Sequence, residues 1–91
     1  MTKKRERLEV IYDILNIICD HNNSIRPTPL LRFSNLSSSG FSEYYTELTA
    51  KGFIKEFKDA KGRMHVTLAD KGFLYLEKYR LIVGFINDFE L

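Results

Sequence analysis

The sequence is poor in cysteine and has no long apolar run. Cys19 is the single cysteine of the 91 residues, which excludes an internal disulfide framework and is consistent with a reducing, intracellular setting. No apolar run reaches the roughly 18 residues that cross a bilayer, so we expect no membrane partner. The basic residues near the start precede an amphipathic segment rather than an apolar one, so the sequence does not predict a signal peptide.

Groups that commonly catalyse reactions or bind metals are equally scarce. Besides Cys19, the sequence offers only His21 and His65, and Cys19-Asp20-His21 lacks the second ligand pair of a zinc site. Cys19 is more typical of a buried core cysteine, and His65 is more typical of a contact with solvent or a partner. No glycine-rich phosphate loop is present. We therefore predict no enzyme, no cofactor, no metal site and no small-molecule ligand.

The net charge of +2 is small, but the basic residues are concentrated. Residues 51–63 contain five basic and two acidic residues, and residues 3–7 contain four basic residues and Glu6. Charge gathered in a terminal arm and a hairpin is typical of a surface that contacts phosphates. A solvated lysine-rich surface is the alternative interpretation.

With 44% hydrophobic residues, seven Phe and five Tyr, the chain has the composition of a packed protein rather than a disordered one. Its length suits a single domain over residues 1–91. Apolar spacing and turn residues predict helices over 4–21, 28–34, 38–51 and 69–91, with a two-stranded hairpin over 53–68. In the first helix the apolar stripe begins at Leu8, and in the second Leu30, Leu31 and Phe33 supply the apolar contacts.

The segment 35–54 organises this prediction. Phe41, Tyr44 and Leu48 recur at the spacing of one helical face, so we expect the aromatic residues here to be core rather than base-stacking platforms. Ser37 is a candidate N-cap, and Gly52 stands where a left-handed residue ends a helix. Two helices joined by a short turn and followed by a hairpin predict an α+β, mostly α fold: a winged helix-turn-helix with a two-stranded wing and a long C-terminal dimerisation helix. An isolated ribbon is marginally stable, so the wing must pack on the helices through Ile54, Val66 and Leu68.

The last helix carries more apolar surface than one domain needs to cover. A seam with spacings of 4, 3, 4 and 3 predicts a homodimer interface, formed by Tyr75, Tyr79, Ile82, Ile86 and Phe89. The alternative is that this helix folds back along the first helix and buries both of its apolar sides internally.

The order of elements, the pattern of residues 35–54 and the segment Leu68-Ala69-Asp70-Lys71-Gly72 resemble the archaeal family of small, about ten-kilodalton, chromatin-associated winged-helix DNA-binding proteins. The resemblance implies double-stranded DNA binding with little sequence preference, by dimers joined through antiparallel last helices. It also implies a cytoplasmic, nucleoid-associated protein that acts in chromatin or in transcription regulation. Ala69 stands where the family has a capping threonine, so we expect Asp70 or Thr67 to cap the last helix instead.

The expected DNA-binding residues are hydroxyl side chains on the third helix and cations around it. They are Arg26, Arg32, Ser37, Ser38, Ser39, Ser42, Thr46, Lys58, Lys61 and Arg63. Serine and threonine do not form the bidentate pairs that read a base strongly, so sequence specificity should be low. Glu43 and Glu47 share this helix face and would repel phosphates unless they accept from cytosine or pair with lysine. They support the alternative function, a protein–protein interaction module that does not bind DNA.

Overall fold

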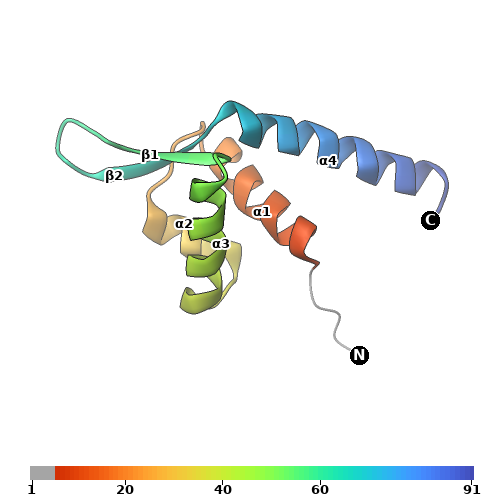
Figure 1. Cartoon of the computed structure of the whole chain (residues 1–91), viewed down its shortest axis with the longest axis horizontal. Coiled ribbons are helices and arrows are strands. Elements are labelled where there is room, and N and C mark those ends of the chain that lie inside the picture. The colour runs from red at the N-terminus through yellow and green to blue at the C-terminus, as the bar shows by residue number, and fades with distance from the viewer. Residues whose placement is uncertain (1–5) are drawn as a thin grey trace.

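The computed structural model describes residues 6–91. The elements follow in the order α1 (Arg7–Asp20), α2 (Pro27–Ser34), α3 (Ser38–Ala50), β1 (Ile54–Lys58), β2 (Met64–Leu68) and α4 (Asp70–Asp88). Helices α1, α2 and α3 form a body, the β1–β2 hairpin extends from one side of it, and α4 extends from the other (Figure 1). This is the predicted winged helix-turn-helix, mostly helical, with one antiparallel sheet of two strands.

Helix bounds differ from the predicted ones by up to three residues. The expected start of the first helix at Lys4 lies outside the described residues, and α1 begins at Arg7 after an extended N-cap residue, Glu6. Helix α4 ends at Asp88 instead of continuing to residue 91. The reason is Glu90, which adopts a left-handed backbone with φ of 55°. Helical hydrogen bonding stops there.

The core is built around α1. Ile14, Leu15 and Ile18 are at most 1% exposed and pack with Leu30, Leu48 and other apolar residues of every remaining element. Leu8 was expected in this stripe, but it is 53% exposed. It lies in the first turn of α1, at the edge of the body, where it lines an open pocket with Phe53 and Tyr75. The apolar periodicity correctly predicted a helix with one buried face. It did not show how far along α1 the other elements extend to cover that face.

The turn between α2 and α3 is held by local hydrogen bonds. Asn35 takes a left-handed backbone at the end of α2, and buried Ser34 donates to the carbonyl of Leu31 at 2.7 Å. The Ser37 hydroxyl accepts from the backbone N–H of Gly40 at 3.1 Å, which confirms Ser37 as the N-cap of α3. Phe33 was expected to supply an apolar contact of α2, but its side chain is 53% exposed and lies beside His21. It is on the outer side of a helix only eight residues long.

Helix α3 ends as the sequence predicted. Gly52 has φ of +80°, and the N–H of Phe53 reaches back to the carbonyl of Leu48 at 2.9 Å, which is a Schellman motif. The strand that follows is anchored to α4, since the carbonyl of Phe53 accepts from the N–H of Ala69 at 3.0 Å. A Cβ on Gly72 would lie 2.5 Å from the same carbonyl oxygen, so only glycine fits this crossing.

The hairpin packs on the body through the three residues expected. Ile54, Val66 and Leu68 are at most 4% exposed, and Ile54 pairs with Leu68 at the base of the ladder. Val66 also exchanges two backbone hydrogen bonds with Ile25, at 2.7 and 3.1 Å. This pairing of Ile25 with the wing was not predicted, because Ile25 stands alone between turn residues and prolines and shows no periodicity. It ties the wing to the loop between α1 and α2.

Within residues 6–91, the hydrogen bonds and ring stacking that join α4 to α1 come from residues 75–80 of α4. The Tyr75 hydroxyl donates to the carbonyl of Leu8 at 2.6 Å, Tyr79 stacks on Tyr12 with ring centroids 4.5 Å apart, and Arg80 donates to Asn16 at 2.9 Å. Beyond Arg80 the apolar side chains are exposed. The alternative that α4 buries both apolar sides against α1 is therefore wrong.

Two further observations concern α4. No side chain caps its first turn, so the expected capping by Asp70 or Thr67 is wrong; the carbonyl of Ala69 accepts from Gly72 instead. Within residues 6–91, no helix combines the length and the hydropathy that a membrane span requires.

Candidate nucleic-acid interface

The outward face of α3 carries small hydroxyl side chains. Ser38, Ser39, Ser42 and Thr46 are exposed, as a DNA-contacting face requires. The Ser37 hydroxyl is also exposed, but it already caps the helix through Gly40. The aromatic side chains of α3 point the other way: Phe41 is buried and Tyr44 and Tyr45 pack against the core. They are core residues, as predicted.

One acid of α3 is neutralised from outside the helix. The Glu47 carboxylate forms ion pairs with Arg7 of α1 and with Lys51, the latter at 2.7 Å. The hydrogen bond from Arg7, followed by that from Lys51, lowers the pKa of Glu47 to about 2. Arg7 also lies over the Tyr44 ring, 5.9 Å from its centroid. Glu47 therefore presents little net negative charge on this face.

Tyr45 connects α3 to the wing. Its hydroxyl donates to the carboxylate of Glu56 on β1, and burial, followed by this bond, raises the pKa of Tyr45. Because the phenol stays protonated, the link persists at neutral pH. The position of the wing relative to α3 is therefore fixed by a polar contact in addition to the buried base of the hairpin.

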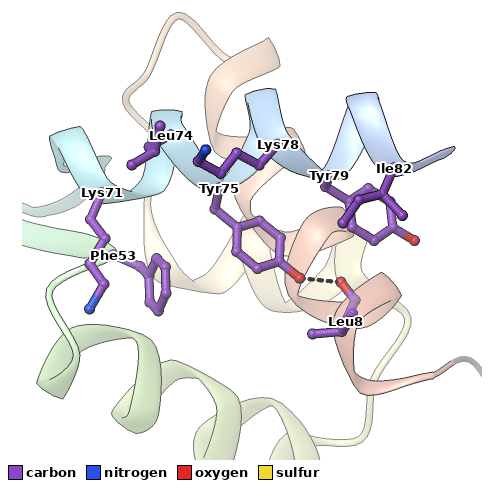
Figure 2. A pocket seen from close by; sticks show the side chains of 8 residues that line it. All are labelled: Leu8, Phe53, Lys71, Leu74, Tyr75, Lys78, Tyr79 and Ile82. Carbon is purple, nitrogen blue, oxygen red and sulfur yellow. Dashed lines mark hydrogen bonds between the residues drawn. The ribbon is translucent and has the colours of Figure 1, made fainter. Parts of the chain in front are cut away.

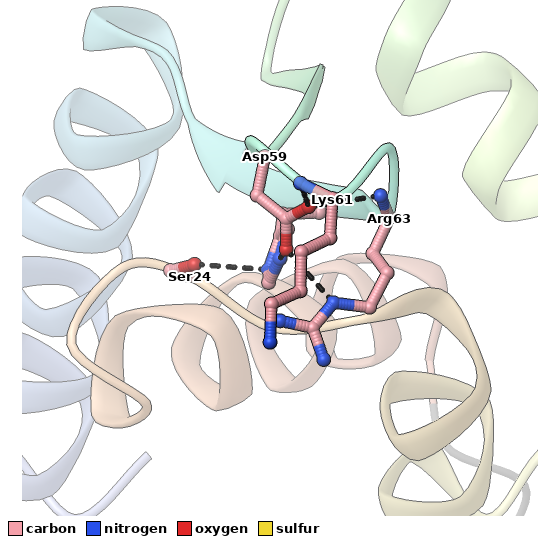
Figure 3. A network of polar contacts seen from close by, with 5 residues as sticks. Ser24, Asp59, Lys61 and Arg63 are labelled. Atoms are coloured by element: carbon pink, nitrogen blue, oxygen red, sulfur yellow. Dashed lines mark hydrogen bonds and ion pairs between the residues drawn. The ribbon is translucent and has the colours of Figure 1, made fainter.

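The wing loop is organised by one carboxylate, that of Asp59. It accepts from the backbone N–H groups of Lys61 and Arg63 at 2.9 Å, from Nε of Arg63 at 3.0 Å, and lies 2.9 Å from Nε2 of His65. The His65 contact, followed by the N–H of Arg63, holds the pKa of Asp59 well below its usual range. Lys61 and Arg63 extend their side chains in the same direction from this loop (Figure 3). Gly62 has φ of +79°, the left-handed backbone that this turn requires.

His65 has a different role from the one expected. Its side chain is only 21% exposed, stacks on Phe57 and places Nδ1 3.4 Å from the Ser24 hydroxyl. It therefore joins the wing loop to the loop after α1 instead of facing a partner. Only its neighbours in space reveal this role.

The remaining predicted cations are exposed on elements next to α3. Arg26 is the N-cap residue of α2, Arg32 lies in the last turn of α2, and Lys58 is the last residue of β1. The structure groups Lys61 with Arg63 through Asp59, but it does not bring Arg26 or Arg32 into contact with either. Sequence reasoning missed Asp59 as an organiser and Arg7 as a partner of α3. The pattern Asp-Ala-Lys-Gly-Arg could have indicated the first, because aspartate at a turn commonly accepts from backbone N–H groups ahead of it.

The expected dimer residues divide into two groups. Tyr75 and Tyr79 lie partly against α1, while Ile82, Ile86 and Phe89 are 54%, 39% and 63% exposed. A pocket of about 340 Å³ lies beside Tyr75.

The chain belongs to the winged helix-turn-helix family, whose model matches residues 4–85. Among solved structures, it is similar to Sso10a-2, a DNA-binding protein from Sulfolobus solfataricus, with a TM-score of 0.74 and 15% identity over 94% of this chain and 86% of that one. It is similar to F93 from STIV, a winged-helix DNA-binding protein, with a TM-score of 0.73 and 16% identity over 88% and 91% of the two chains.

A third similar structure is the PcaV transcriptional regulator from Streptomyces coelicolor, with a TM-score of 0.73 and 19% identity; the match covers 86% of this chain but 58% of that one. At these identities the similarity shows a shared fold. A comparison with curated protein sequences finds no significant match.

Proposed function

We propose that the protein binds double-stranded DNA as a homodimer with low or modest sequence specificity, in transcription regulation or in chromatin. The observation that carries the proposal is the combination of an exposed hydroxyl-bearing face on α3 with an ordered cationic wing beside it. The N-terminus of α3 presents backbone N–H groups near Ser38 and Ser39, and such a helix end favours phosphate. The family supports the proposal, as do the solved relatives whose names describe DNA-binding proteins.

Low specificity follows from the side chains available on α3. Ser42 and Thr46 can each form single hydrogen bonds, whereas strong discrimination comes from bidentate pairs made by Arg, Asn or Gln. Affinity would come mainly from phosphate contacts of the surrounding cations, with the wing at the minor groove or its backbone. Such contacts hold the protein on the duplex but carry no sequence information.

Dimerisation through α4 is proposed from its uncovered side chains. Each large apolar side chain contributes roughly 1.5–3 kcal/mol when fully buried, and Ile82, Ile86 and Phe89 remain substantially exposed in one copy. A contiguous exposed apolar surface of this kind is typical of an interaction site. Two copies would also bring two α3 helices to one duplex.

The alternative function, a protein–protein interaction module, rested on Glu43 and Glu47. The pairing of Glu47 with Arg7 and Lys51 removes much of the repulsion that this acid would exert on DNA. Only Glu43 still favours the alternative.

The test is a fluorescence-anisotropy titration of several unrelated 30-base-pair duplexes at a series of salt concentrations. We expect binding at micromolar protein or tighter in low salt, similar affinities for the different sequences, and a steep loss of affinity as salt rises. Absence of binding in low salt would favour the interaction module. A large preference for one sequence would contradict the low specificity.

A further inference from the structure

Helix α4 lines an apolar pocket near its start and carries exposed apolar side chains near its end. The pocket is at the start of α4, where Leu74, Tyr75 and Ile82 form one wall and Leu8 and Phe53 form the others (Figure 2). Its volume is about 340 Å³, and a cavity of about 150 Å³ already holds a benzene ring. The pocket is therefore large enough for an aromatic side chain.

The other end of α4 presents such a side chain in a defined position. The N–H of Leu91 donates to the carbonyl of Ile86 at 2.9 Å, and the N–H of Glu90 donates to Asn87, which completes a Schellman motif. Phe89 is held within this cap, packs against Phe85 with centroids 4.8 Å apart, and is 63% exposed. Its ring cannot reach the pocket of its own chain, because both lie on the same rigid helix.

We infer that the pocket receives Phe89 of a second copy of this chain, with the two α4 helices antiparallel and Ile82 at their two-fold axis. The inference rests on the proposed homodimer and assigns its register. Tyr75 and Phe89 each lie seven residues from Ile82, which is two helical turns or about 10.5 Å in either direction. An antiparallel pair centred on Ile82 therefore places Phe89 of each copy opposite Tyr75 of the other. In the same register Tyr79 lies three residues before Ile82 and Ile86 lies four residues after it. Tyr79 of one copy and Ile86 of the other are therefore offset by one residue, about 1.5 Å along the axis, and both still lie between the helices.

Charge favours this direction over the parallel one. The pocket is bordered by Lys71 and Lys78, while the end of α4 carries Asp88 and Glu90 and no basic residue after Arg80. Residues 70–80 of α4 also contain Arg80, Asp70 and Glu77, so this half of the helix has a net charge of +1. Antiparallel helices bring the acidic end of each copy to this weakly basic start of the other. Parallel helices would instead place the two acidic ends together, which is destabilising, and would leave both pockets without an occupant.

Mixed disulfide trapping tests the register, with Cys19 replaced by serine in every variant. Lys78→Cys and Phe85→Cys are suitable because both side chains are exposed and the register brings residue 78 of one copy close to residue 85 of the other. A disulfide requires Cα atoms about 4.4–6.8 Å apart. We expect rapid oxidation to a covalent dimer when the two variants are mixed, and little when either is oxidised alone. Efficient trapping of either variant alone would indicate another register or a parallel dimer, and would overturn the inference.

A second measurement compares two charge insertions by analytical ultracentrifugation. Phe89→Glu should raise the dimer dissociation constant at least tenfold and leave a folded monomer, because Phe89 is exposed within one copy. Leu81→Glu is the matched control: Leu81 is 67% exposed on the same helix but about 100° around it from Ile82. It should change the constant less than threefold. Equal effects of the two variants would contradict the assigned face. A wild-type protein that sediments as a monomer would refute the homodimer itself, whatever its DNA binding.

Discussion

The carboxylate of Asp59 lies 2.9 Å from Nε2 of His65, so an acidic residue organises the loop that carries Lys61 and Arg63. The same carboxylate accepts from the backbone of Lys61 and Arg63 and from the Arg63 side chain. Its negative charge stands inside the proposed DNA-binding wing. The benefit of ordering the two cations and the cost of repelling phosphate therefore oppose each other at this residue.

Asp59→Ala should weaken DNA binding even though it makes the protein more positive. Loss of the loop's hydrogen bonds, each contributing about 0.5–1.5 kcal/mol, should raise Kd roughly fivefold. Anisotropy titrations at fixed salt measure this. Glu77→Ala makes the same charge change on an exposed site of α4 and should not weaken binding. Tighter binding of Asp59→Ala would show that net charge outweighs loop order.

The double variant Lys61→Ala/Arg63→Ala should bind DNA more weakly and with a smaller salt dependence. If both side chains contact phosphate, the slope of log K against log salt should fall by about two per protomer. The charge-conserving exchange Lys61→Arg/Arg63→Lys is the control and should retain the slope. An unchanged slope in the alanine variant would remove the wing from the interface.

The ion pairs of Glu47 should make stability depend on acid pH. The pKa of Glu47 is lowered in the fold from 4.5 to about 2, so folding favours the ionised form. The stabilisation is complete above pH 4.5 and is lost as the pH falls toward 2. Thermal melts of wild type and Glu47→Gln should therefore differ most at neutral pH and converge near pH 2. Curves that remain parallel over this range would contradict the role of Arg7 and Lys51.

Two glycines of α4 should respond to alanine in opposite directions. Gly72→Ala places a Cβ 2.5 Å from the carbonyl oxygen of Phe53 and should destabilise the fold by about 1–3 kcal/mol. Gly84 has open space around its Cβ position, so Gly84→Ala should stabilise by up to about 1 kcal/mol through helix propensity. Chemical denaturation at one protein concentration measures both. Destabilisation by Gly84→Ala would reveal a neighbour at that face of α4.

The residues that end or begin elements could be predicted because their partners are a few positions away. Ser37 bonds to Gly40, and Gly52 and Gly62 adopt the positive φ that their turns require. Apolar spacing likewise predicted the buried faces of α1 and α3 and the buried base of the hairpin. These features depend on local geometry, which a short stretch of sequence specifies.

Only the tertiary structure decided which side chains would meet across the chain. Arg7 and Glu47 are 40 residues apart, and His65 reaches Ser24 across 41. Neither pairing leaves a periodic signal, because each depends on how α1 is placed against α3 and the wing. The exposure of Leu8 and of the end of α4 is of the same kind: the sequence predicts that a stripe is apolar, but the positions of the other elements decide how much of it one copy can cover. For this protein the sequence by itself determined the winged helix-turn-helix and the apolar stripe of its last helix. The packing of the body determined which part of that stripe stays exposed.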